Sequence, residues 1–257
     1  KVYRLPLGNP QARGKALVNL LPLEEGETIT TLMPMPDDAH AASAHVMFAT
    51  STGNVRRNAL SDFVDIKANG KIAMKLEEGG ERLIAVQPCT EADDVLLAVR
   101  GGKCIRFPVT DVRVFSGRTS TGVRGIRLAN GDEVISMSIL RHADFSVEER
   151  SAFLRLQRQK RGETEADVET AAEPEAEEAP AATSAVTLSK ERIAEMEAMQ
   201  EFLLAITEKG FGKRSSAYEY RIAGRGGQGI ANIDVTDKNG PVVASFPSVD
   251  ASRARAS

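Results

Sequence analysis

The chain contains 257 residues, 42% of them hydrophobic, which is enough apolar material for one or two globular domains with a core. Its longest apolar runs are far shorter than the roughly 20 residues that cross a bilayer, so we expect no membrane segment. The cysteines Cys89 and Cys104 form no Cys-x-x-Cys pair, and we expect a reducing, cytoplasmic location. The three histidines lack the spacing of metal ligands, and we predict no metal site.

The net charge of −3 is unevenly distributed along the chain. Residues 141–201 carry 8 Lys and Arg against 15 Asp and Glu, which leaves 25 basic and 21 acidic residues in the rest of the chain. The overall acidic balance therefore comes from one segment. It does not exclude an anionic partner such as a nucleic acid for the remainder.

The first predicted elements are two short strands separated by the turn glycine Gly26, at residues 14–20 and 29–32. A hairpin follows at residues 46–57, in which an apolar strand leads to Gly53 and then to a strand that ends in Arg57. After it come two further strands, at residues 70–76 and 83–86. The same pattern then recurs twice, with hairpins at 95–106 and 203–214 and later strands at 122–128, 134–137, 229–235 and 242–244.

Four short strands in each repeat predict an all-β fold, a propeller-like array of four-stranded blades. Residues 1–140 would form the leading blades, the first of them partial, and residues 202–257 a further blade, giving about three and a half blades in all. The spacing leaves one alternative open, an ordinary antiparallel sandwich in which the same glycines mark turns.

Residues 141–201 interrupt the repeat and are predicted to form an insertion. Ser146 and Glu149 form a capping-box pattern at the start of a predicted helix at residues 146–161, and a second helix is predicted at residues 189–200. Between them, residues 162–185 are rich in Glu, Ala, Pro and Thr, and we expect a flexible acidic loop. Two interpretations stay open: an acidic competitor for a basic surface, or an insertion that the surface tolerates.

No residue pattern in the chain indicates catalysis or a cofactor. Residues 224–229 match the Gly-x-Gly-x-x-Gly pattern of dinucleotide sites, but they precede a strand-like segment and not a helix. The tyrosines Tyr3, Tyr218 and Tyr220 have no cluster of arginines or metal-binding acids beside them in the sequence. We therefore predict no catalytic residue and no cofactor in this chain.

Basic residues recur at the same position of each hairpin, at Arg57, Arg106 and Arg214, with Arg56, Lys103 and Lys213 beside them. More follow each hairpin, at Lys67, Lys71, Arg113, Arg118, Arg124, Arg127, Arg221 and Arg225. In a radial array, equivalent positions lie along one circumference, so the pattern predicts a curved basic band that bends duplex DNA through backbone contacts. The predicted DNA-binding residues are Arg56, Arg57, Lys71, Lys103, Arg106, Arg118, Arg124, Lys213, Arg214 and Arg225. The alternative is that they are ordinary solvated surface charges.

Several sequence strings resemble one known family. They are Lys1-Val-Tyr-Arg-Leu-Pro, Thr121-Gly-Val-Arg-Gly-Ile-Arg-Leu128, and Gly210-Phe-Gly-Lys-Arg214 followed by Tyr218-Glu-Tyr. These strings are similar to the C-terminal domain of the DNA gyrase A subunit. The resemblance implies a β-pinwheel that wraps double-stranded DNA within an ATP-dependent type II topoisomerase. It also implies a partner B subunit in an A2B2 heterotetramer, with the cleavage tyrosine, ATP and Mg²⁺ located outside this chain.

The family's Gln-Arg-Arg-Gly-Gly-Lys-Gly box has no full match here. Residues 225–229 are similar to its second half, but Ala223 stands where the leading glutamine would be. Two alternative functions stay open: the C-terminal domain of the A-type component of topoisomerase IV, and a protein-binding propeller in which the insertion helices dock a partner.

Overall fold

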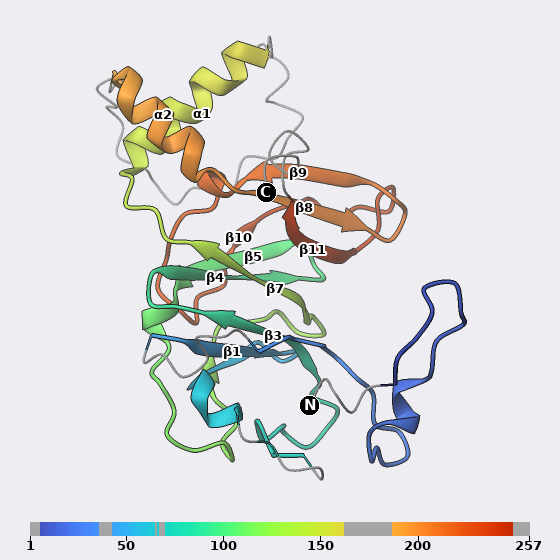
Figure 1. Cartoon of the computed structure of the whole chain (residues 1–257). Helices are drawn as coiled ribbons and strands as arrows, with labels where there is room; N and C mark the ends of the chain where they lie inside the picture. The colour runs from blue at the N-terminus through green and yellow to red at the C-terminus, as the bar shows by residue number, and fades with distance from the viewer. Residues whose placement is uncertain (1–5, 36–42, 65, 67–69, 162–186, 249–257) are drawn as a thin grey trace.

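The computed structural model describes residues 6–35, 43–64, 66, 70–161 and 187–248. Within this part of the chain, three antiparallel sheets lie side by side, with two helices at one end of the array (Figure 1). We call the sheets the first, second and third blades in chain order. In the same described ranges, no helix is long and apolar enough to cross a membrane.

Each blade is built on one of the three predicted hairpins. The hairpins are β1 (His45–Thr50) with β2 (Asn54–Ala59), β4 (Asp93–Val99) with β5 (Lys103–Pro108), and β8 (Phe202–Thr207) with β9 (Gly212–Ser216). Gly53, Gly102 and Gly210 turn the chain with φ angles of +86°, +88° and +83°, which L residues rarely adopt. A short 3-10 helix follows each hairpin: η3 (Leu60–Phe63), η4 (Val109–Asp111) and η6 (Ala217–Glu219).

The last strand of each repeat returns to its own hairpin. These strands are β3 (Leu83–Cys89), β7 (Val134–Arg141) and β11 (Val242–Ser248), and they pair antiparallel with β1, β4 and β8. β7 also contacts both β3 and β11, so the three strands run next to one another along one side of the array (Figure 1). We call this side the inner edge.

In the second and third repeats, the remaining strand is exchanged with the preceding blade. β6 (Val123–Arg124) belongs to the second repeat but pairs with β2, and β10 (Ile230–Ala231) belongs to the third repeat but pairs with β5. The approach is so close that a Cβ on Gly122 would lie 2.4 Å from the carbonyl oxygen of Val55, and one on Gly229 would lie 2.4 Å from that of Cys104. β6 and β10 therefore form the edge opposite to β3 and β7, the outer edge.

The exchange explains why some predicted strands are absent. Residues 14–20 contain the 3-10 helix η2 (Leu17–Asn19), and residues 29–32 and 70–76 are not strands. A strand at 14–20 or 70–76 would have to pair with the hairpin of the preceding repeat, and a strand at 29–32 would have to pair with the hairpin of its own repeat. The described residues before β1 contain no hairpin, so these three segments have no strand to pair with. The half blade predicted before β1 is therefore not formed as a sheet, and the third blade has three described strands.

The hydrophobic core lies between the blades. Val95 and Leu97 on β4 pack toward the first blade against Met47 and Val55, whereas Leu96 and Ala98 pack toward the third blade against Leu203. β4 is therefore buried on both faces, and its residues 95–99 form a continuous apolar run. β8 instead alternates between buried and half-buried residues, because the described chain covers only one of its faces.

The insertion contains the two predicted helices, α1 (Val147–Arg161) and α2 (Lys190–Met199). The predicted capping box is present: Glu149 N donates to Ser146 Oγ at 3.1 Å, and Ser146 N donates to Glu149 Oε2 at 2.8 Å. Ser189 caps α2 in the same manner by accepting from Arg192 N. The acidic stretch predicted at residues 162–185 lies outside the described residues, as do Tyr3 and Lys67.

Candidate nucleic-acid interface

Three of the arginines predicted to form an exposed band are buried. Arg56, Arg57 and Arg106 are 0%, 5% and 3% exposed, so the prediction that they lie on an outer band is wrong. The reason is the next repeat: Val114 forms a parallel bridge with Arg57, and Ile222 forms one with Arg106. Arg214 is exposed because the described chain has no further repeat to cover it.

Arg106 connects the second blade to the third. Its Nε donates to Asp94 Oδ2 at 2.8 Å, its Nη1 to the carbonyl oxygen of Ala217 at 2.7 Å, and its Nη2 to that of Arg141 at 3.1 Å. Asp94 is fully buried and also accepts from His142 Nδ1, at 2.7 Å, when that nitrogen carries the proton. The recurring hairpin arginine is therefore part of the joint between blades.

Arg56 connects the first blade to the second repeat in a similar manner. Its Nε donates to Asn58 Oδ1 at 2.8 Å and its Nη1 to Ser120 Oγ at 2.9 Å, and the guanidinium lies 4.8 Å from the centre of the Phe115 ring. Burial, and then the positive charges of Arg113 and Arg118, hold the pKa of Arg56 below its usual value. The lowered pKa thus reflects burial together with the positive charges of the arginines that surround Arg56.

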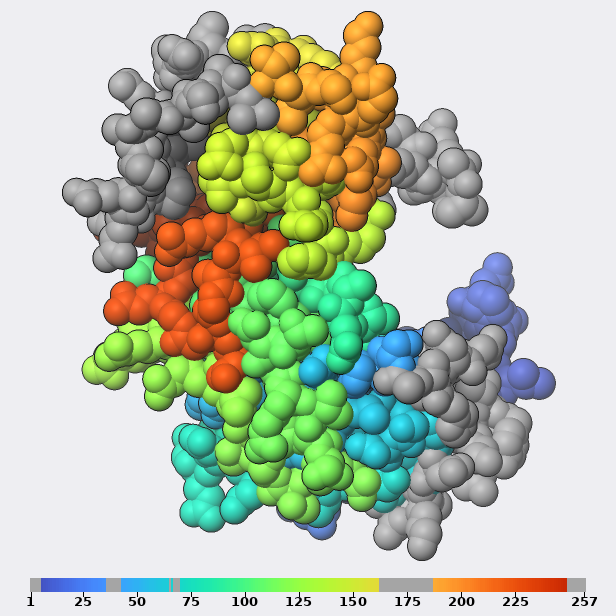
Figure 2. All heavy atoms as spheres, turned by 90° about the vertical axis from the view of Figure 1, so that its left-hand side faces the viewer, coloured from blue at the N-terminus to red at the C-terminus, as the bar shows by residue number. Residues whose placement is uncertain are grey.

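The exposed positive charge lies on the outer edge. We define the outer rim as residues 111–128 and 221–231, the segments that contain β6 and β10; they carry six arginines and one acid, Asp111, a net charge of +5 against −3 for the whole chain. The two segments lie side by side, because Gly226 N donates to Gly125 O at 2.7 Å and Arg127 N donates to Gly227 O at 2.8 Å. Figure 2 faces this side, where the green atoms of the second repeat meet the orange atoms of the third.

The arginines on the outer rim differ in how firmly they are held. Arg113, Arg124, Arg127 and Arg221 are exposed, and the guanidinium groups of Arg124, Arg127 and Arg221 make no hydrogen bond or ion pair with the described residues. Arg225 is half-buried and donates to the carbonyl oxygens of Asp111 and Arg124, at 3.2 and 2.6 Å. Arg113, Arg127 and Arg221 belong to the basic pattern of the sequence but are not among the predicted DNA-binding residues. That prediction favours the recurring hairpin position, where Arg57 and Arg106 are buried.

The first repeat contributes to the same side of the molecule. Lys71 is exposed and donates to the carbonyl oxygen of Asp62 at 2.8 Å. Arg118 is half-buried and its Nε donates to the carbonyl oxygen of Ile72 at 3.0 Å. Residues 70–76 therefore lie against the rim, and Lys71, Arg118, Arg124 and Arg225 are brought together along it.

The other predicted DNA-binding residues lie on the second and third hairpins. Lys103 is exposed at the start of β5, opposite Ala231 of β10. Lys213 is half-buried, and its Nζ donates to the carbonyl oxygen of Asn232 at 3.2 Å. Arg214 lies over the Phe202 ring, 3.7 Å from its centre, and donates to Ser248 Oγ at 3.1 Å. Their role in DNA contact stays a prediction.

A groove of about 540 Å³ borders the rim between β5 and residues 221–231. Lys103, Arg106 and Arg221 line it together with the glycine-rich loop at residues 224–229 and a single acid, Asp234. The loop precedes β10 and no helix begins there, which removes the main structural requirement of a dinucleotide site.

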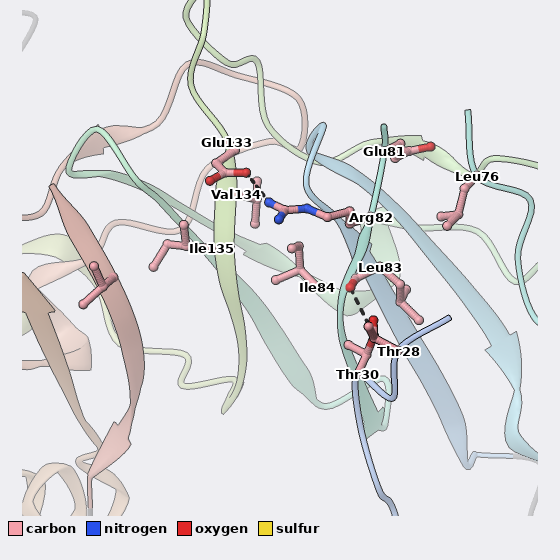
Figure 3. A pocket seen from close by; sticks show the side chains of 11 residues that line it. Thr28, Thr30, Leu76, Glu81, Arg82, Leu83, Ile84, Glu133, Val134 and Ile135 are labelled. Carbon is pink, nitrogen blue, oxygen red and sulfur yellow. Dashed lines mark hydrogen bonds and ion pairs between the residues drawn. The ribbon is translucent and has the colours of Figure 1, made fainter. Parts of the chain in front are cut away.

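A second cavity of about 540 Å³ lies at the inner edge, and its charged lining residues are one arginine, Arg82, and two acids, Glu81 and Glu133 (Figure 3). Arg82 and Glu133 form an ion pair at 2.5 Å across it, and Glu81 accepts from the backbone nitrogen of Glu77 and from Asn54 Nδ2. Unlike the outer rim, this cavity offers no unbalanced positive charge. A polyanion is therefore attracted electrostatically to the outer side and not to this cavity.

The tyrosine and cysteine side chains of the described repeats are buried in the core. Tyr218 Oη donates to the carbonyl oxygen of Met196 at 2.9 Å, and Tyr220 Oη donates to Asn232 Oδ1 at 2.7 Å. Burial raises the pKa of Tyr218 to about 12 and raises that of Tyr220 as well. It also raises the pKa of the Cys89 and Cys104 thiols to about 12 each. Neither tyrosine nor either thiol is activated as a nucleophile.

Comparison with known proteins agrees with this architecture. The family model described as the DNA gyrase C-terminal domain, a β-propeller, matches residues 44–90, 93–141 and 201–248. Each match covers one blade-forming repeat and together they leave out the insertion. In fold, the chain is similar to the C-terminal domain of DNA topoisomerase IV, with a TM-score of 0.66 at 16% identity over 97% of this chain and 59% of that one. It is also similar to the E. coli ParC C-terminal domain, with a TM-score of 0.54 at 14% identity over 93% and 73%.

Curated relatives carry the name of the DNA gyrase A subunit. The chain is 51% identical to the protein from Granulibacter bethesdensis over 253 residues, 96% of this chain and 27% of that protein. It is 48% identical to the protein from Rickettsia bellii over 248 residues, 96% of this chain and 26% of that protein. The chain thus spans about a quarter of the length of these relatives. The three matched repeats show that the chain belongs to the DNA gyrase C-terminal domain family of β-propellers.

Proposed function

We propose that this chain binds double-stranded DNA on the outer rim and wraps it around the blades. The observation that carries the proposal is the set of exposed rim arginines, Arg124, Arg127 and Arg221, whose charges the described residues leave uncompensated. They come from successive repeats, so a duplex that follows them passes from one repeat to the next across the blades. Contacts of this kind reach phosphates and need no base sequence.

The energetic requirement fits the number of available charges. Bending 20 to 30 base pairs by 40° to 90° costs on the order of 1–6 kcal/mol, which several phosphate contacts must offset. The rim supplies six arginines, and Lys71 and Lys103 add positive charge beside it. Loss of one or two of these cations should therefore reduce the bend more than it reduces attachment.

For the parent protein we propose the role its relatives' name describes, that of the DNA gyrase A subunit. In this role the chain supports ATP-dependent negative supercoiling in the cytoplasm, within an A2B2 assembly with a B subunit. The ATP, the Mg²⁺ and the catalytic tyrosine belong to other parts of that assembly. The relatives at 46–51% identity support a gyrase over a topoisomerase IV, since the topoisomerase IV likeness is one of fold.

A protein-binding role for the insertion helices has less support. Phe153 and Met196 are buried, and Ile193 and Met199 pack against them in a cluster that includes Tyr218 of the third blade. The apolar sides of both helices are therefore occupied within the chain. They leave no continuous apolar face for a partner among the described residues.

The test is a topological assay on the full-length protein. Nicked circular DNA is sealed by ligase with and without protein, and the change in linking number is measured on a gel. A variant with Arg124, Arg127 and Arg221 changed to Glu should trap little or no linking difference. As a matched control, Lys190, Lys209 and Lys238, exposed cations away from the rim, are changed to Glu. Equal trapping by the rim variant and the wild type would refute the proposal.

A further inference from the structure

The insertion helices contact both blades at one joint. The joint is the boundary between the second and third blades, where β7 ends at Arg141 and β8 begins at Phe202. The family model leaves this segment unmatched, so the helices are an addition to the repeating unit. An insertion that the surface merely tolerates would be attached at its two ends only, whereas these helices also pack against η6 of the third blade.

The third blade is held through the 3-10 helix η6. Tyr218 Oη donates to the carbonyl oxygen of Met196 on α2 at 2.9 Å. The rings of Phe145 and Phe153 each lie 5.6 Å from the Tyr218 ring and nearly perpendicular to it, a favourable arrangement for aromatic pairs. Gln200 Nε2 donates to Ser216 Oγ, the cap of η6, at 2.9 Å.

The second blade is held through the end of β7. The Arg141 guanidinium donates to the carbonyl oxygen of Met199 at 3.2 Å, and Arg141 N donates to Glu201 Oε2 at 2.8 Å. The carbonyl oxygen of Arg141 accepts from Arg106, which also donates to the carbonyl oxygen of Ala217 in η6. The contacts therefore run without interruption from β5 through η6 to α2.

The two helices are also fixed to each other. Arg192 on α2 donates to Glu149 on α1 at 2.7 Å and lies over the Phe145 ring, 4.5 Å from its centre. Gln157 on α1 and Gln200 exchange side-chain hydrogen bonds at 2.9 Å. A pair of helices held in this manner transmits a displacement at one end to the other.

We infer that α1 and α2 form a brace that sets the angle between the second and third blades and thereby the course of DNA along the rim. The inference rests on the proposed function. Arg124 and Arg127 lie on the outer strand of the first blade and the segment after it, and Arg221 lies on the segment that covers the second blade. Arg221 directly follows η6, which the brace holds, so a change in the angle at this joint shifts Arg221 relative to Arg124 and Arg127. The helices thus act on the direction of the duplex without touching it.

The experiment undocks the brace and measures bending and attachment separately in the full-length protein. The variant is Phe153→Ala with Met196→Ala, which empties the cluster between the helices and η6, and the control is Val147→Ala on the exposed side of α1. The linking difference trapped at saturating protein should fall by about half or more, because one of the two described joints loses its fixed angle. DNA affinity and its salt dependence should stay within about twofold of the wild type, because no phosphate contact is removed.

Two results would overturn the inference. One is unchanged trapping by a variant whose β4, β5 and β8 amides keep their protection from hydrogen exchange. The other is a parallel loss of affinity and trapping, which would show that the helices contact DNA themselves. If β8 loses protection, the milder Tyr218→Phe variant replaces the double variant, since it loses one hydrogen bond and keeps the ring, and a smaller fall in trapping is expected. Failure of the wild type to trap any linking difference would refute the proposed function instead.

Discussion

The two joints between blades are built very differently. Between the first and second blades, three residues connect β3 to β4, and Arg57 has one acidic partner, the exposed Glu91, at 3.4 Å. Between the second and third blades, sixty residues connect β7 to β8, and Arg106 has the fully buried Asp94 and two carbonyl oxygens. The same position of the repeat thus supports a weak joint and a strong one.

The difference follows from one neighbouring position. The residue opposite the arginine on the first strand of the hairpin is Met47 in the first blade and Leu96 in the second. The residue two positions before it is His45 in the first blade and Asp94 in the second. In the third blade the equivalent residue is Phe202, whose ring lies under Arg214. A recurring arginine therefore does not define a function by itself, since its partner decides whether it is buried as an ion pair, buried with little compensation, or stacked on a ring.

The largest expected effect is at the strong joint. Arg106→Ala leaves Asp94 buried without its cation, and loss of one partner of a buried pair costs roughly 3–5 kcal/mol of unfolding free energy. Urea denaturation of the full-length protein, followed by hydrogen exchange in β4 and β5, measures the loss. A change no larger than that of Arg57→Ala would show that the two joints are equivalent.

The next effect tests the exchanged strands that both joints share. Gly229→Ala places a Cβ against the carbonyl oxygen of Cys104 at a φ of +75°, and it should cost roughly 2–4 kcal/mol. Gly131→Ala is the matched control, because its φ is +78° and it has open space around it, and it should cost about 1 kcal/mol. Equal losses in thermal unfolding would mean that strand exchange does not constrain this position.

The weak joint should respond less. Arg57→Ala removes a cation whose partner, Glu91, has a side chain that is 62% exposed and thus largely screened by solvent. The expected loss is about 1 kcal/mol or less in urea denaturation. The variant also removes the Nε of Arg57, which has no hydrogen-bond partner among the described residues. A loss that matches Arg106→Ala would contradict the ranking of the joints.

The smallest effect is a pH dependence of the weak joint. Burial, and then the charge of Arg57, lower the pKa of His45 below its usual 6.5, while Glu91 acts in the opposite direction. The unfolded chain then binds the proton more tightly than the folded one, so stability is complete above about pH 6.5 and falls as the pH drops toward the lowered folded pKa. His45→Gln should flatten this part of the stability profile. An unchanged profile would exclude His45 as its source.

Much of the architecture is readable from the sequence because turns and alternation are local properties. The hairpins, their turn glycines, and the helices that begin after Ser146 and Ser189 all lie where the residues predict them. The exchange of β6 and β10 is a long-range property, and its one local sign is the glycine before each strand, Gly122 or Gly229, which an ordinary turn also explains. The repeat is therefore predictable from the sequence, whereas the exchange is not.

The candidate site was harder to predict for the same reason. The positions of Arg56, Arg57 and Arg106 recur, and recurrence in a repeat protein indicates a structural contact as readily as a binding contact. The burial of each arginine depends on the repeat that follows it. The next repeat covers Arg57 and Arg106, whereas no described repeat follows Arg214, which is exposed. Separating joint residues from rim residues required the three-dimensional arrangement.

The central claim is that the rim arginines hold DNA while the hairpin arginines hold the blades. The most direct test is the salt dependence of DNA binding by the full-length protein, measured by filter binding, for Arg124→Gln with Arg127→Gln and Arg221→Gln. The slope of log affinity against log salt should become shallower by about 0.9 for each arginine that neutralises a phosphate, or about 2.7 in total. Arg57→Gln should leave the slope unchanged. An unchanged slope in the rim variant, or an equal reduction in Arg57→Gln, would contradict the account.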